Sequence, residues 1–252
     1  MHSVFRVLTD KPWRVEAVAQ LLMAAAVCLI LSSFWLASDA DRTGAPNGAL
    51  RTLGATLTFQ GAVVVMLWFF ARKHALSLRE AFGLHLQPGR AAVLGITVAL
   101  AFVPVALGLQ AGTLKLAELL HFQLPEQTAV TLLRITNAWP DRIAFGFMVI
   151  IAAPLAEEGL FRGVFYPAMR RHGFPNAAMW VTSLAFALIH FNVLIFIPLV
   201  VLAIVLVKLY ERTGNLLACI ACHATFNAFN FVMLFTEKYW KQIFDHFIPP
   251  VP

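Results

Sequence analysis

The sequence predicts an all-α fold, a polytopic bundle of seven or eight transmembrane helices. Three observations lead to this class. Of the 252 residues, 60% are hydrophobic and 13% are charged, and the mean hydropathy is +0.76. A soluble domain carries about 25% charged residues, and a soluble globule of this size cannot bury so much apolar surface. The apolar residues are also grouped in runs close to the roughly 20 residues that cross a bilayer.

Seven apolar segments account for the predicted spans. Three basic residues, Arg6, Lys11 and Arg14, precede the first segment, and a signal peptide likewise has basic residues before its apolar run. The apolar run of this first segment is longer than the roughly 7–15 residues of such a peptide, so we interpret it as an uncleaved span. The fifth and sixth segments are short and nearly continuous, which leaves their boundary open. The seven segments are residues 15–37, 51–71, 91–111, 141–168, 175–191, 193–210 and 215–236.

Residues 112–140, between the third and fourth segments, mix apolar and polar side chains at helical spacing. This pattern is typical of an interfacial or re-entrant helix, and it also allows an eighth crossing. The sequence contains no internal repeat, low-complexity tract or soluble domain. We therefore expect residues 1–252 to form a single integral membrane domain.

The formal net charge of +6 does not indicate nucleic-acid binding, because the basic residues form short clusters between apolar segments. If the N-terminus is cytoplasmic and the chain crosses seven times, the cytoplasmic side holds 11 of the 19 lysines and arginines and the far side holds 7, with Arg162 inside a span. The positive-inside rule therefore favours a cytoplasmic N-terminus. The compact chain without a eukaryotic targeting tail suggests a prokaryotic inner (plasma) membrane.

The fourth segment contains two adjacent glutamates and an arginine. Ionisable groups inside a bilayer are costly unless they are paired or lie in a solvated cavity. Glu158 and Arg162 are four residues apart, share a helix face and are expected to pair. Glu157 lies about 100° around the helix from Glu158, and a carboxylate left outside such a pair is a candidate general base. The alternative is a buried ion network of all three groups that only fixes helix packing.

Two further segments contribute polar side chains. His190 lies near the end of the fifth segment. His223 and Asn227 share one face of the seventh, so that both can donate hydrogen bonds toward one point as an oxyanion hole requires. Taken singly, each group is also explained as a polar contact between helices. At about 1.5 Å per residue along the spans, Glu157, His190 and His223 fall in the middle or cytoplasmic half of the membrane, within reach of one cavity.

The order Glu-Glu-x-x-x-Arg, Phe-x-x-x-His and His-x-x-x-Asn, with each motif in an apolar span, resembles the CPBP family. This family comprises CAAX proteases and bacteriocin-processing (Abi) intramembrane glutamate proteases, and it includes the Ras-converting CAAX endoprotease. Residues 209–216, just before the last motif, also resemble the family. The resemblance covers residues 142–235, which we expect to form a CPBP-like catalytic core, whereas the first 140 residues are similar only in hydropathy.

The resemblance implies a hydrolase that cuts a peptide bond in a cavity within the membrane. Glu157 would activate a water molecule with the help of His190, His223 and Asn227 would stabilise the oxyanion, and the ion pair of the fourth segment would support the site. The implied enzyme is metal-independent and needs no cofactor. Its substrate would be a peptide or lipidated protein, such as a prenylated CAAX-type tail or another membrane-associated C-terminal tail, and its other partners would be membrane lipids.

Three other interpretations remain open from the sequence. Glu157, His190 and His223 could bind zinc, although the chain has no His-Glu-x-x-His motif. Residues 219–223 spell the Cys-x-x-Cys-His motif of c-type haem attachment, but they lie inside an apolar span. The same buried charges also occur in a non-catalytic membrane scaffold, an immunity protein or a transporter, although the chain lacks the paired halves common in transporters.

Overall fold

The computed structural model describes residues 11–40, 48–122, 128–136 and 138–237, and these residues contain helices and no strand, which confirms the all-α class. In chain order, the elements are α2 (Val15–Ala40), α3 (Gly48–Lys73), α4 (Leu78–Ala81), α5 (Pro88–Leu119), α6 (Thr128–Ile135), α7 (Trp139–Phe147), the π-helix η1 (Met148–Ala152), α8 (Ala153–Glu158), the π-helix η2 (Gly159–Phe165), α9 (Tyr166–Arg170), α10 (Pro175–Leu188), α11 (Val193–Thr213) and α12 (Leu216–Phe235).

Six helical stretches in the described part of the chain are long and apolar enough to cross a membrane: Val15–Phe34, Arg51–Lys73, Pro88–Leu119, Trp139–Arg170, Val193–Thr213 and Leu216–Phe235. The chain is therefore an integral membrane protein, but the predicted count of seven or eight spans is not confirmed. The segment at 175–191 forms only the 14-residue α10, whose length of about 21 Å falls short of the roughly 30 Å hydrocarbon core. Residues 112–140 supply the end of α5 and the eight-residue α6.

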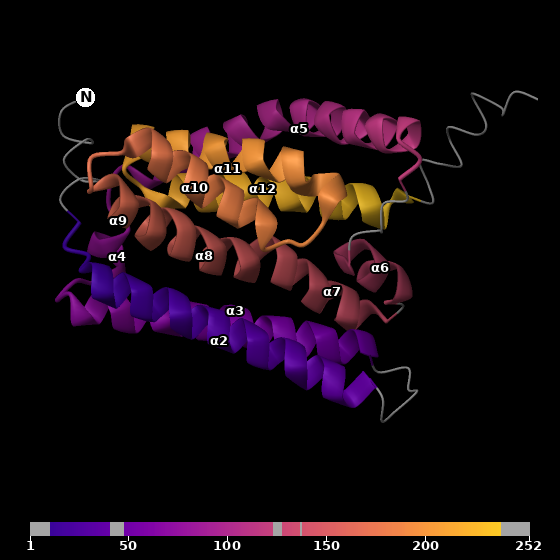
Figure 1. Cartoon of the computed structure of the whole chain (residues 1–252), viewed down its shortest axis with the longest axis horizontal. Coiled ribbons are helices and arrows are strands. Elements are labelled where there is room, and N and C mark those ends of the chain that lie inside the picture. Colours follow the sequence, from indigo (N-terminus) through magenta and orange to yellow (C-terminus); the bar gives the residue numbers. More distant parts are fainter. Residues whose placement is uncertain (1–10, 41–47, 123–127, 137, 238–252) are drawn as a thin grey trace, which may run out of the picture.

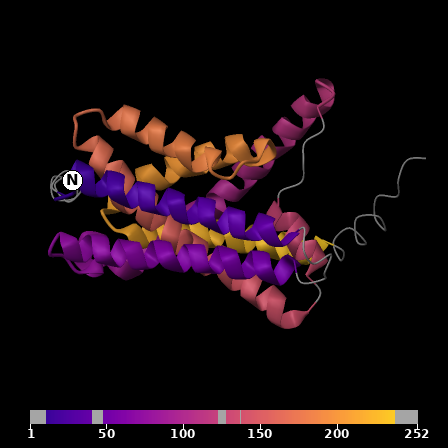
Figure 2. The ribbon, with the colours of Figure 1, turned by 60° about the horizontal axis from the view of Figure 1, so that its bottom comes forward.

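The helices lie roughly side by side (Figure 1). The α2–α3 pair lies on one side of the long helix formed by α7 to α9, and α10, α11 and α12 lie on the other. Helix α12 packs along α5, and α10 packs along α11. Figure 2 shows the C-terminal half of α5 leaning away from the bundle, where Leu107, Leu114 and Leu119 are exposed as expected of side chains that face lipid.

The packing of α5 against α12 depends on a glycine. A Cβ atom at Gly95 would lie 2.2 Å from the carbonyl oxygen of Ala218 and 3.0 Å from the backbone nitrogen of Cys222. Both neighbours are backbone atoms of α12, so they cannot rotate away. Small residues allow such close backbone approach between membrane helices, and this contact fixes α12, which carries His223, against α5.

Gly95→Ala is expected to lower the free energy of unfolding by about 1–3 kcal/mol, because the added methyl group forces α5 and α12 apart. Thermal unfolding of the purified protein in detergent measures this loss. Gly108→Ala is the matched control on the same helix, since nothing lies within 4 Å of the added atom and alanine favours a helix by about 1 kcal/mol. Equal stability of the two variants would show that the close contact is unimportant.

A tight turn joins α11 to α12 and anchors the α4–α5 loop. Gly214 ends α11 at φ +63°, a left-handed conformation that suits glycine. Asn215 then caps α12 by accepting a hydrogen bond from the backbone N–H of Leu217. Its Nδ2 donates to the Leu86 carbonyl at 2.7 Å, and the Leu216 N–H donates to the Phe82 carbonyl at 3.0 Å. The start of α12 is thus tied to the loop before α5.

The residues before α2 dock onto the bundle through two buried side chains. Trp13 is 2% exposed, and its Nε1 donates to the Gly163 carbonyl of η2 at 3.1 Å. Lys11 is 6% exposed, and its Nζ donates to the Ala81 carbonyl at the end of α4. Burial lowers the pKa of the Lys11 ammonium to about 8, because a desolvated charge is disfavoured.

The stability of the protein is expected to rise with pH through the titration of Lys11. Below about pH 8 the ammonium is charged in both the folded and unfolded chains, and its burial cost is fully present. Between about pH 8 and 10.5 the folded chain has lost a proton that the unfolded chain keeps, so the free energy of unfolding rises by about 1.4 kcal/mol per pH unit. Unfolding measured at several pH values should show this slope in the wild type but not in Lys11→Met, and parallel curves would contradict it.

Candidate active site

The candidate site is built on a helix that changes its winding. Within Trp139–Arg170, α8 carries Glu157 and Glu158 and is flanked by the π-helices η1 and η2. In a π-helix the backbone bonds connect residues five apart, and such segments are frequent at functional sites. The N–H of Ala153 donates to the Met148 carbonyl in this manner. The two glutamates therefore lie on a short regular turn between two widened ones.

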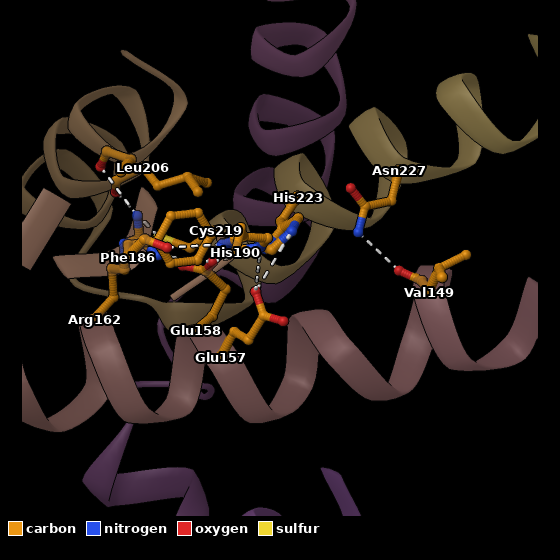
Figure 3. Close-up of polar contacts among 11 residues, drawn as sticks. Val149, Glu157, Glu158, Arg162, Phe186, His190, Leu206, Cys219, His223 and Asn227 are labelled. Carbon is orange, nitrogen blue, oxygen red and sulfur yellow. Dashed lines mark hydrogen bonds and ion pairs between the residues drawn. The ribbon is translucent and has the colours of Figure 1, made fainter. Parts of the chain in front are cut away.

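Pro154 explains how η1 is joined to α12. The N–H of Ala153 donates to the Met148 carbonyl. Pro154 has no N–H, so it cannot donate to the carbonyl of Val149, five residues earlier. Asn227 fills this need, because its Nδ2 donates to the Val149 oxygen at 2.8 Å. A free backbone carbonyl inside a membrane must find a partner, and the side chain of α12 supplies it (Figure 3).

Glu158 and Arg162 form the ion pair expected from their spacing. Oε1 of Glu158 accepts from Nη1 of Arg162 at 3.0 Å, and the two side chains are 0% and 1% exposed. Arg162 also donates from Nη2 to the Ala203 carbonyl of α11 at 3.2 Å. Its guanidinium lies 4.4 Å from the ring centroid of Phe186, a favourable contact for a cation. The pair thus connects α8, α10 and α11.

His223 is held by the same carboxylate. Its Nδ1 donates to Oε1 of Glu158 at 2.8 Å, and the ring is buried. Glu158 Oε1 therefore accepts from both Arg162 and His223. With Nδ1 committed to this bond, the other ring nitrogen, Nε2, faces Glu157 at 4.0 Å.

His190 reaches the same point from a break in the helices. Helix α10 ends at Leu188, and Phe191 adopts φ +47° before α11 begins at Val193. Non-helical backbone at membrane depth is tolerated where it is enclosed by protein or lines a polar cavity. Nδ1 of His190 donates to the Phe186 carbonyl at 2.7 Å, which leaves Nε2 pointing to Oε2 of Glu157 at 3.9 Å.

The carboxylate of Glu157 lies between the two histidines (Figure 3). Its Oε2 is buried and has no hydrogen-bond partner among the described residues, although the side chain as a whole is 19% exposed. The Nε2 nitrogens of the two histidines thus each lie near 4 Å from this oxygen. These separations are too long for direct hydrogen bonds and suit a small polar molecule that contacts all three atoms.

The charges of the cluster follow from these contacts. Glu158 and Arg162 neutralise each other. Glu157 is not paired with an arginine among the described residues and instead faces the two histidines.

The structure brings together five of the six residues singled out from the sequence: Glu157, Glu158, Arg162, His190 and His223. Asn227 lies one turn further along α12, and one N–H of its amide is used by Val149. The amide has a second N–H, so its role in oxyanion binding stays a prediction.

Phe186 is the residue at the site that sequence reasoning did not assign. Its ring centroid lies 5.0 Å from that of His190 and 5.7 Å from that of His223, and the ring also contacts Arg162. Its carbonyl accepts from His190. The Phe-x-x-x-His spacing was the available signal, since residues four apart share a helix face.

The two cofactor alternatives gain no support from the side chains. Among the described residues, no three His, Cys, Asp or Glu side chains are grouped closely enough to hold a metal ion. Cys219 and Cys222 are fully buried, and Cys219 Sγ donates to the Leu206 carbonyl at 3.3 Å. Their thiols face protein, whereas haem attachment needs room for a macrocycle.

Comparisons with known proteins point to one family. Residues 138–229 match the family model described as type II CAAX prenyl endopeptidase Rce1-like. Comparisons with curated proteins and with solved structures each gave no significant match. The matched segment includes every residue of the cluster and the helices that position it. Residues 138–229 are therefore similar to the type II CAAX prenyl endopeptidase Rce1-like family.

Proposed function

We propose that the protein is a metal-independent intramembrane glutamate endopeptidase, with residues 142–235 as its catalytic core. The observation that carries the proposal is the position of Glu157 Oε2, which is buried without a hydrogen-bond partner among the described residues and faces Nε2 of His190 and of His223. A carboxylate placed beside two imidazoles can hold a water molecule and remove its proton.

In the proposed reaction, Glu157 and His190 orient the water. As its oxygen bonds to the scissile carbonyl carbon, the water loses a proton to Glu157, and the carbonyl oxygen becomes an oxyanion. When the intermediate collapses, the C–N bond breaks and the leaving nitrogen takes the proton from Glu157. No covalent bond to the protein forms, so one water is consumed for each bond cut.

His223 needs a particular protonation state to stabilise the oxyanion. Its Nδ1–H is bound to Glu158, so Nε2 can donate only if the ring is an imidazolium. The carboxylate of Glu158 stabilises this cation, as a carboxylate does beside the histidine of a catalytic triad. The second N–H of Asn227 would act with it. The two histidines thereby have different roles although both face Glu157.

We propose that the substrate is a prenylated CAAX-type tail or another membrane-associated C-terminal tail, since the matched family is one of prenyl endopeptidases. We further propose a prokaryotic inner membrane with the N-terminus in the cytoplasm. The basic residues at the ends of α3 and α9, namely Arg72, Lys73 and Arg170, would then face the cytoplasm.

The test compares protein termini in source-organism membranes that contain the wild type or Glu157→Gln. Specific new termini that vanish with the variant would establish a protease and identify its substrates. A farnesylated CAAX peptide and its unprenylated twin, added to the protein in liposomes, would then test the lipid requirement. Matching termini profiles, with the variant folded and expressed, would favour a non-catalytic scaffold, immunity protein or transporter.

Metal removal separates this proposal from the zinc alternative. We expect cleavage by the purified protein to be unchanged after dialysis against a strong chelator, because water activation is assigned to Glu157 and His190. Loss of activity that returns on adding zinc would contradict the metal-independent mechanism. A soluble zinc protease treated in parallel confirms that the chelation was effective.

A further inference from the structure

A cavity unrelated to the proposed catalytic cluster opens where α5 begins and α11 ends. Its volume is about 900 Å³, and it is open on one side. Arg90 and Arg212 line it together with the apolar side chains of Leu86, Val93 and Leu94. This end of the bundle is also where α2 begins and α9 ends (Figure 1).

The polar part of the cavity is suited to an anion. None of the residues lining it is acidic. In the described part of the chain, no carboxylate forms an ion pair with Arg90 or Arg212, and Nη1 of Arg90 donates to Oε1 of Gln87 at 3.2 Å. The 32-residue α5 also begins here, and Gln87 at its N-cap provides no side-chain cap. The uncapped helix start adds partial positive charge to that of the two arginines.

The other part of the cavity is apolar and faces outward. Val93 and Thr97 lie about 200° around α5 from Gly95, which faces α12. Val93 is accordingly 64% exposed. From Arg90 to Thr97 the wall runs about 10 Å along α5, from the basic end toward the middle of the membrane. The cavity is therefore cationic at one end and apolar along its depth.

The walls of the cavity are fixed to each other. Asn215 bonds to the Leu86 carbonyl, and the neighbouring Leu216 bonds to the Phe82 carbonyl. These contacts hold the loop before α5 against the turn that follows Thr213. A molecule bound here would contact both α5 and α11 and would stabilise the bundle at this end.

We propose that this cavity binds an anionic phospholipid, with the phosphate contacted by Arg90 and Arg212 and an acyl chain along Val93 and Leu94. Basic cavities between transmembrane helices are known to bind anionic head groups. The chemistry shared with free phosphate is the anionic head, but only a lipid also occupies the apolar wall. The inference does not depend on the proposed protease activity.

The test measures lipid binding to the full chain in neutral detergent by native mass spectrometry, with phosphatidylglycerol, phosphatidylcholine and inorganic phosphate as probes. Arg90→Gln/Arg212→Gln is expected to weaken phosphatidylglycerol binding about 30-fold, equivalent to about 2 kcal/mol. Arg72→Gln/Arg79→Gln is the matched control, because it removes two exposed arginines outside the cavity and should leave binding within about twofold.

A second variant tests the apolar wall while both arginines remain. Val93→Trp fills that wall and is expected to weaken phosphatidylglycerol binding. If misfolding caused the loss of binding instead, the unfolding temperature measured without lipid would also fall. Equal binding by the cavity and control variants would overturn the proposal. So would equal affinity for phosphatidylcholine, or displacement of the lipid by millimolar phosphate, which would indicate a small-anion site instead.

Discussion

Replacing Glu157 by glutamine is expected to abolish peptide cleavage, with a fall in rate of about 10³-fold or more, while the protein stays folded. General base catalysis contributes about 10²–10⁴-fold, and the amide retains the size of the side chain but cannot accept the proton of water. Because Oε2 of Glu157 has no protein partner among the described residues, the substitution breaks no hydrogen bond within that part of the chain.

Two measurements check this result. Initial rates of cleavage of a lipidated peptide give the loss of activity. The free energy of unfolding, measured by thermal unfolding in detergent, should change by no more than about 0.5 kcal/mol. Glu118→Gln is the control: Glu118 is exposed and paired with Lys115 on α5, so both quantities should match the wild type. Full activity in Glu157→Gln would refute the proposed mechanism.

Sequence spacing was sufficient to predict the contacts made within one helix. Residues four apart on a helix share a face, and Glu158 and Arg162 pair as that rule requires. The exclusion of Glu157 from the pair followed from the same geometry. The convergence of Glu157, His190 and His223 was predicted from their depths along separate spans, and the structure places Oε2 of Glu157 about 4 Å from Nε2 of each histidine.

The sequence separated the fifth and sixth segments at residue 192, but it did not predict how short the fifth helix is. Residues 175–191 are apolar enough to be interpreted as a span, yet α10 ends at Leu188. The cause is local: Asn192 caps α11 by accepting from the Ile195 N–H, and Phe191 takes a positive φ. An asparagine before an apolar run is a known start signal, and the predicted segments 175–191 and 193–210 meet at this residue.

The contact of Asn227 with Val149 was beyond sequence reasoning. It depends on a π-helix that leaves one carbonyl free near Pro154, and on a side chain 78 residues away in the chain. Helical spacing predicted the face of α12 on which Asn227 lies, together with His223. It carried no information on which atoms of α7 to α9 that face would meet.

Removing the carboxylate of Glu158 alone is expected to destabilise the protein severely. Glu158→Ala leaves the guanidinium of Arg162 buried without its counter-charge and deprives His223 of the acceptor for Nδ1. Breaking a buried ion pair from one side costs about 3–5 kcal/mol. Activity should also be lost, in contrast to Glu157→Gln, in which only the chemistry fails.

A double variant separates the structural role of this pair from its role in orienting His223. Glu158→Leu/Arg162→Met replaces both buried charges with apolar groups of similar volume, and such exchanges are often neutral or stabilising. We expect its unfolding temperature to recover toward that of the wild type, while cleavage remains lost because nothing holds His223 Nδ1. Recovery of cleavage together with stability would show that the carboxylate serves packing alone. Failure to recover stability would show that the hydrogen bonds to His223 and Ala203, rather than charge balance, hold these helices together.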